Sequence, residues 1–166
     1  MKKITQQRLE NIALFYLERY ESSQARLKQV LLRRIAKARL KGVEVPDGAA
    51  QWVETVCAKM VHLGYVNDTR YAENIWRSYS SAGKSVRWMT CKLKQAGIDE
   101  DVISQCIASD DTDSLDLQAA RLLVKKKKLG HYRPKEQRSA YAQKDLAKLA
   151  RAGFSYETAQ KALRDD

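Results

Sequence analysis

A glycine-centred pattern recurs along this chain and constrains its fold more than any other sequence feature. In residues 92–100 and again in residues 148–156, a helix-like stretch of basic and apolar residues is followed by glycine, an apolar residue and a helix-capping residue. When the two segments are aligned, Gly97 and Gly153 occupy the same position. Residues 40–43 begin the same pattern around Gly42. An internal repeat of this kind is typical of tandem arrays in which each unit buries its apolar face against its neighbours.

The stretches between the glycines predict helices. The chain has only seven glycines and two prolines, and the rest is rich in strong helix formers such as Ala, Leu, Lys and Glu. Apolar residues recur at helical spacing, Ser22–Ser23 and Ser85 provide N-cap hydroxyls, and Gly42, Gly64, Gly97 and Gly153 follow helix ends. We expect the first helix to run to about Tyr20 and the seventh to begin at Ser114.

The predicted fold is therefore all-α, with nine helices in three three-helix modules at residues 1–66, 67–113 and 114–166. A three-helix unit of this size buries little apolar area alone, so neighbouring modules must share contacts. We expect the modules to form an elongated tandem array of helices that can curve and is of the right-handed type. The cysteines Cys57, Cys91 and Cys106 lie far apart in apolar helical stretches, which predicts buried, reduced thiols.

A net charge of +11 indicates a polyanionic or acidic binding partner. The excess of Lys and Arg lies in the first and last modules, and acids gather in residues 99–113. No apolar run is long enough to span a membrane, and the polar start after Ile4 does not resemble a signal peptide. We expect a cytoplasmic protein that does not bind membranes.

The residues offer no enzyme site. Gly83-Lys84-Ser85 resembles the end of a phosphate-binding loop, but Ser78 stands where that motif needs glycine, and a helix rather than a strand is expected before it. His62 and His131 lack Cys, Asp or Glu neighbours at metal-ligand spacing. We predict no catalytic residues, no metal and no cofactor.

Several segments resemble the RecX family. Residues 13–23 are similar to its opening helix and turn, and residues 64–73 match its Gly-Tyr-apolar-Asp-Asp-x-Arg-aromatic-Ala-Glu signature except for Asn67. Residues 83–99 and 144–154 are similar to its middle-module and final hairpins, although residues 31–51 are longer than usual. The family-motif residues, expected to be structural, are Gly64, Tyr65, Asp68, Arg70, Tyr71, Ala72, Gly97 and Gly153.

The resemblance implies a negative regulator of RecA. A member of this family lies in the groove of the RecA filament on single-stranded DNA and inhibits filament extension, ATP hydrolysis and strand exchange. It thereby modulates recombination, DNA repair and the SOS response. The expected partners are the RecA filament and, through the filament or directly, single-stranded DNA, and we expect the protein to be a monomer.

Cations fall in helical stripes on the middle helix of each module, where they form a continuous track if the modules align. A lysine run at the end of the seventh helix adds charge, although it also complements the helix dipole and solvated helix faces often look like this. The candidate contacts for RecA or DNA are Arg26, Arg33, Lys37, Lys84, Arg87, Lys94, Lys125, Lys126, Lys127, Lys128, Arg133, Lys144, Lys148 and Arg151.

The alternative is a stand-alone, basic helical DNA-binding protein. Residues 85–96 and 99–107 could form a helix-turn-helix around Gly97. Asp99, Glu100 and Asp101 would then open the recognition helix and face phosphates or base edges, which disfavours sequence-specific reading of duplex DNA.

Overall fold

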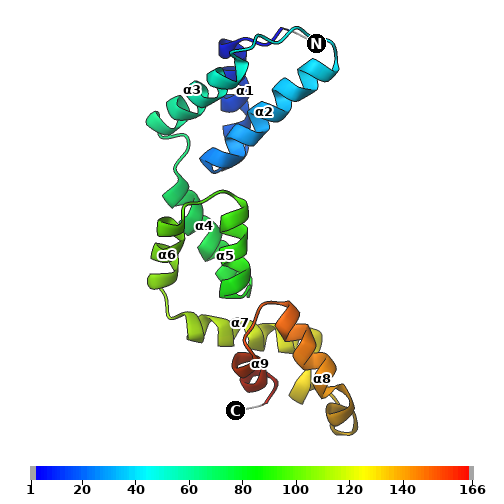
Figure 1. Ribbon diagram of the computed structural model, residues 1–166. Helices are drawn as coiled ribbons and strands as arrows, with labels where there is room; N and C mark the ends of the chain where they lie inside the picture. The colour runs from blue at the N-terminus through cyan, green and yellow to red at the C-terminus, as the bar shows by residue number, and fades with distance from the viewer. Residues whose placement is uncertain (1–2, 165–166) are drawn as a thin grey trace. The chain divides into compact units, whose positions relative to one another are not determined.

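The computed structural model describes residues 3–164, whose regular secondary structure is entirely helical, with no β-strand in that range (Figure 1). The all-α prediction is confirmed. The elements are α1 (Gln6–Leu17), α2 (Gln24–Leu40), α3 (Ala49–His62), α4 (Asp68–Ser81), α5 (Val86–Gln95), α6 (Glu100–Ala108), α7 (Thr112–Lys127), the 3-10 turn η1 (Gly130–Tyr132), α8 (Lys135–Arg151) and α9 (Tyr156–Leu163).

The helices belong to two compact units. The first contains Met1–Tyr71 together with Ala96–Ile98, and the second contains Ala72–Gln95 and Asp99–Asp166. The short segment Ala96–Ile98 joins the first unit because it packs on the start of α2. The division into three modules at residues 1–66, 67–113 and 114–166 stays a prediction.

The core of the first unit lies among α1, α2 and α3. Leu27, Leu31 and Ile35 recur every fourth residue on α2 and are almost completely buried. Each such side chain stabilises the fold by about 1.5–3 kcal/mol through the removal of its apolar surface from water. Ser23 forms the N-cap of α2, as the sequence predicts, since its hydroxyl accepts a hydrogen bond from the Arg26 N–H.

In the second unit, small side chains let α7 and α9 pack closely. Ala120 on α7 and Ala159 and Ala162 on α9 are buried, and Leu149 of α8 completes this core. Farther along the unit, α4 is fixed to the connector after α6 by a 2.8 Å hydrogen bond from the Trp76 indole N–H to Asp110.

One helix junction occurs twice, once in each unit. In the first, the Ser23 hydroxyl donates to the carbonyl of Ala96, and the N–H of Gln24 donates to the Asp68 carboxylate at 2.8 Å. In the second, the Ser85 hydroxyl donates to the carbonyl of Ala152, and the N–H of Val86 donates to Asp116, both at 2.7 Å. The start of one helix is thus locked to the turn before a later helix.

The repeated glycines are what allow this close approach. Gly97 and Gly153 have positive φ angles of 72° and 97°. A Cβ atom on Gly97 would collide with the side chain of Ala25, and one on Gly153 would collide with the Ser85 hydroxyl. The sequence pattern therefore marks a tertiary contact as well as a helix end.

Three local predictions are wrong. Helix α1 ends at Leu17 rather than near Tyr20, because the chain must turn to bury Ser22 and Ser23 at the start of α2, and Tyr20 is exposed. Helix α7 begins at Thr112 rather than Ser114, since the Asp111 carboxylate caps it by accepting from the Ser114 N–H.

The third concerns the cysteines. All three are free thiols, but only Cys57 and Cys106 are buried, and Cys91 is exposed on α5. Cys91 lies away from the face on which Met89 and Leu93 are buried. Burial raises the pKa of the Cys57 thiol to about 11, so this thiol is un-ionised at neutral pH.

Candidate binding surface

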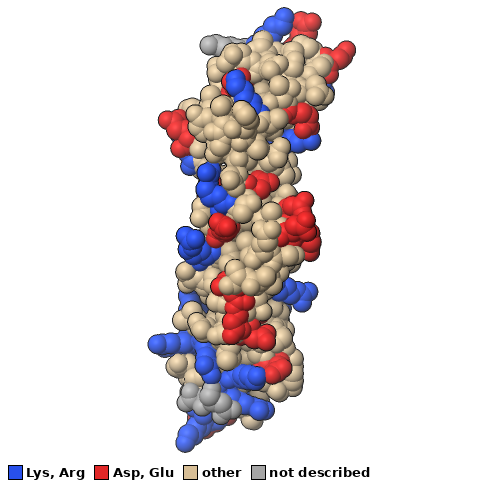
Figure 2. Space-filling view, turned by 90° about the vertical axis from the view of Figure 1, so that its left-hand side faces the viewer, with Lys and Arg blue, Asp and Glu red and all other residues tan. Residues whose placement is uncertain are grey.

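The lysine run forms an exposed cationic end on α7. Lys125, Lys126 and Lys127 occupy its last turn, and Lys128 follows in the left-handed conformation with a φ of 50°. All four side chains are exposed. Figure 2 shows Lys and Arg side chains gathered at the lower end of the view, where Figure 1 has α7, α8 and α9. These four consecutive lysines are the densest cluster of positive charge among the predicted contact residues.

Arg133, unlike the exposed lysine run, forms an ion pair within the fold. Its guanidinium donates two hydrogen bonds to the Asp145 carboxylate, both at 2.7 Å, and the N–H of Gly130 donates to the same carboxylate at 3.0 Å. Asp145 is only 2% exposed. The hydrogen bonds from Arg133 lower the pKa of Asp145, and the ion pair fixes η1 against α8.

Asp145 was not singled out from the sequence. The available signal is its position one turn before the buried Leu149, which places a carboxylate on the apolar face of a basic helix. An acid at such a position requires a buried cationic partner.

The stripe on α5 is partly engaged. Lys94 forms a 3.0 Å ion pair with Glu100, and the Lys84 ammonium lies 4.9 Å from the centre of the Trp88 ring. Trp88 is half-buried, with Tyr79 packed edge-on against it. Arg87 is exposed, so it is the member of this stripe most available to a partner.

The stripe on α8 is exposed along its length, at Lys144, Lys148 and Arg151. The second junction joins the end of this helix to the start of α5, through the hydrogen bond from Ser85 to Ala152. The two stripes of the second unit therefore belong to helices that meet end to end. Arg87, near the start of α5, lies close to Gly153, two residues after Arg151 of α8.

In the first unit, the stripe on α2 and the family motif meet at the start of α4. Arg26 donates a 3.3 Å hydrogen bond to the Tyr71 hydroxyl, while Arg33 and Lys37 are exposed. The residues of the family motif have different structural roles. Gly64 has a φ of 76°, Asp68 caps α2, and Arg70 pairs with Glu21 at 3.5 Å. Tyr65 is exposed, whereas Tyr71 and Ala72 are buried.

The loop Gly83-Lys84-Ser85 cannot act as a phosphate-binding loop. It connects α4 to α5 rather than a strand to a helix, and the Ser85 hydroxyl is occupied by Ala152 and the Trp88 N–H. Within residues 3–164, no group of three or more His, Cys, Asp or Glu side chains is arranged to hold a metal. No helix in that range is long and apolar enough to cross a membrane.

Comparisons with known proteins agree on one family. Residues 67–107 match the family model for the second three-helix domain of RecX. The chain is 37% identical to regulatory protein RecX of Myxococcus xanthus over 98% of this chain and 87% of that protein. It is 31% identical to regulatory protein RecX of Agrobacterium fabrum over 92% of this chain and 80% of that protein.

A solved structure shares the fold. The crystal structure of RecX from Lactobacillus salivarius superposes with a TM-score of 0.67, covering 95% of this chain and 94% of that one at 19% identity. A second crystal structure, of a regulatory protein RecX, has the same TM-score and covers 97% of this chain and 72% of that one. The helical arrangement is thus retained at low sequence identity.

Proposed function

The chain belongs to the RecX family of regulatory proteins, and from this premise we propose that it is a negative regulator of RecA. It binds in the groove of the RecA filament on single-stranded DNA and blocks extension, which lowers ATP hydrolysis and strand exchange. It acts without catalysis, as a monomer in the cytoplasm, and so modulates recombination, DNA repair and the SOS response.

The observation that carries this proposal is the cationic surface of the second unit. Exposed cationic side chains lie at the end of α7, along α8 and at Arg87 of α5, and a hydrogen bond from Ser85 to Ala152 joins the start of α5 to the end of α8. A filament groove offers phosphates and acidic protomer surfaces in a repeating arrangement, and several weak cationic contacts made together give tight binding. Contacts of this kind span neighbouring protomers, so one bound chain can affect many.

The test is RecA's ATP hydrolysis on single-stranded DNA as this protein is added well below one copy per RecA protomer. We expect strong inhibition at these substoichiometric amounts, because blocking growth at a few positions lets dissociation shorten the whole filament. A stand-alone DNA-binding protein would inhibit only when it is abundant enough to cover the DNA.

The control is binding to naked single-stranded DNA at the same concentrations and salt. If hydrolysis is unchanged at equimolar protein while naked DNA is bound in a salt-dependent way, the proposal fails and the general DNA-binding function replaces it.

A further inference from the structure

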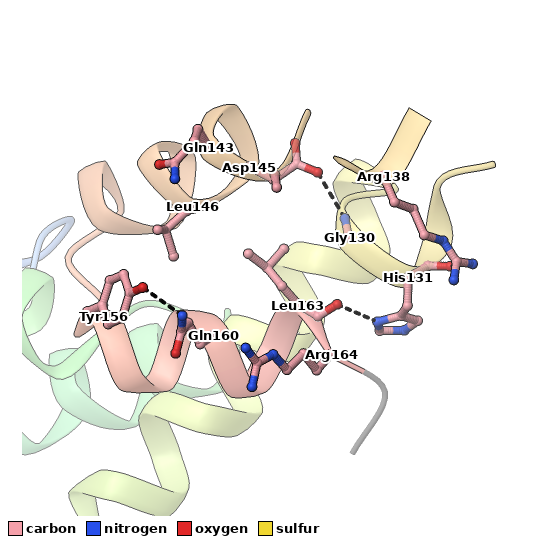
Figure 3. Close-up of a pocket in the computed structure, with 11 residues that line it drawn as sticks. Gly130, His131, Arg138, Gln143, Asp145, Leu146, Tyr156, Gln160, Leu163 and Arg164 are labelled. Atoms are coloured by element: carbon pink, nitrogen blue, oxygen red, sulfur yellow. Dashed lines mark hydrogen bonds between the residues drawn. The ribbon is translucent and has the colours of Figure 1, made fainter. Parts of the chain in front are cut away.

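A cavity of about 490 Å³ lies in the second unit between η1, α8 and α9 and opens to solvent (Figure 3). Its apolar lining comes from Ala142 and Leu146 of α8 and Leu163 of α9. Cavities of this volume accommodate small ligands or a few side chains of a bound peptide. None of the cationic stripes on α5 or α8 lines it, so it is a separate feature of the surface.

Among the described residues that line this cavity, the unpaired charge is positive. Asp145 is the one acid among them, and its carboxylate is already occupied by Arg133 and the N–H of Gly130. Arg138 stands at the rim, where its guanidinium donates to the carbonyls of His131 and Arg133 at 2.6 and 3.0 Å. Figure 3 shows the second cation, Arg164, beside Leu163, with its guanidinium directed toward Gln160 and away from Arg138.

The end of the cavity away from η1 is lined by polar side chains. There the Gln160 amide donates a 2.7 Å hydrogen bond to the Tyr156 hydroxyl, and Gln143 faces them from α8 (Figure 3). Amide and hydroxyl groups at this end can pair with the backbone of an extended peptide. The site therefore combines an apolar floor with hydrogen-bonding side chains and the Arg164 guanidinium beside them.

Helix α8, which forms one wall of the cavity, is exposed to solvent over its first ten residues. Every residue of α8 from Lys135 to Lys144 is exposed, and burial begins only at Asp145. Tyr141 in this stretch lies under Arg133 and Lys144, whose cationic groups are 4.4 and 5.2 Å from its ring centre. An uncovered, cation-rich helix beside an apolar cavity is suited to an acidic, amphipathic partner segment.

We propose that this cavity binds an acidic peptide segment of a protein partner. An apolar side chain of that segment enters between Leu146 and Leu163, and a neighbouring carboxylate pairs with the Arg164 guanidinium. The floor between α8 and α9 is aliphatic, formed by Ala142, Leu146 and Leu163, which favours an apolar side chain over a nucleic-acid base. This inference goes beyond the proposed function, since it concerns the chemistry of a peptide site whichever protein supplies the segment.

The test is fluorescence anisotropy with a short, dye-labelled peptide in which one leucine is flanked by glutamates. Two control peptides replace the leucine by serine or the glutamates by glutamines. We expect the full chain to bind the first peptide at least about tenfold more tightly than either control, a difference of roughly 1.4 kcal/mol. Equal binding of all three peptides would overturn the proposal.

Matched variants locate the binding. Ala142→Phe fills the cavity from an exposed helix position, and Ala140→Phe adds the same side chain at an exposed position of α8 outside the lining. We expect the first variant to weaken peptide binding about tenfold or more and the second to leave it unchanged. Circular dichroism checks that both variants keep their helical content.

A charge pair completes the design. Arg164→Glu should weaken binding of the acidic peptide, while Arg151→Glu, at an exposed position outside the cavity, should have a much smaller effect. Unlabelled single-stranded DNA is added as a competitor. If DNA displaces the peptide and Ala142→Phe abolishes DNA binding as well, the cavity is a nucleic-acid site and the peptide proposal is wrong.

Discussion

At the scale of single residues, Asp145 shows how a basic helix tolerates a buried acid. Its carboxylate accepts two hydrogen bonds from Arg133 and one from the backbone of Gly130, so its charge is fully paired. The carboxylate holds η1, and with it one wall of the cavity, against α8. A buried charge that loses its partner destabilises a fold, so either member of this pair is sensitive to substitution.

Asp145→Asn should destabilise the protein in a pH-dependent way. The folded state lowers the pKa of Asp145, so its stabilisation is complete above the ordinary pKa of about 3.9 and is lost as the pH falls through the lower, folded value. Urea unfolding should therefore show a large difference between wild type and variant near neutral pH. The two unfolding free energies should converge in strong acid, and a difference that did not change with pH would exclude an ionised Asp145 as the cause.

The same residues show the limit of reading the sequence alone. The cationic positions on α5, α7 and α8 were predicted because charge and helical spacing are local properties. The pairing of Arg133 with Asp145 was not, since it depends on the turn at η1 that brings the two side chains together. The end of α1 at Leu17, short of Tyr20, was missed for a similar reason, because the buried serines after it decide where α1 ends.

At the scale of elements, the repeated junction explains why the glycine pattern recurs. The sequence predicts the glycines, the capping serines and the helix order around them. It does not reveal that Ser23 reaches Ala96 or that Ser85 reaches Ala152, because these contacts join helices far apart along the chain. Gly42 has the same backbone conformation, yet a Cβ atom there would meet open space.

Comparing Gly42→Ala with Gly97→Ala separates the energetic cost of backbone strain from the cost of the steric clash at the helix junction. Both glycines have φ angles near 70°, so alanine at either site should cost about 1 kcal/mol of folding free energy. At Gly97 the new methyl group also collides with Ala25, which should add roughly 1–3 kcal/mol. Chemical denaturation of the two variants measures the difference, and equal losses would mean that the junction adapts to the methyl group without cost.

At the scale of the whole molecule, the net positive charge favours a polyanionic or acidic binding partner. The net charge is +11, and exposed cations lie on helix faces, as at Arg33, Lys148 and Arg151. Some cations are paired with glutamates, as at Lys28, Lys59 and Lys161. The lysine run of α7 is exposed to solvent and offers its charge to a binding partner.

The growth of RecA filaments on single DNA molecules tests the central claim most directly. With this protein far below one copy per RecA protomer, we predict that growth stops. A Lys125/Lys126/Lys127→Gln variant should need several-fold more protein, whereas the same change at Lys28, Lys59 and Lys161 should have little effect. Filaments that grow at an unchanged rate in the presence of the wild-type chain would contradict the account.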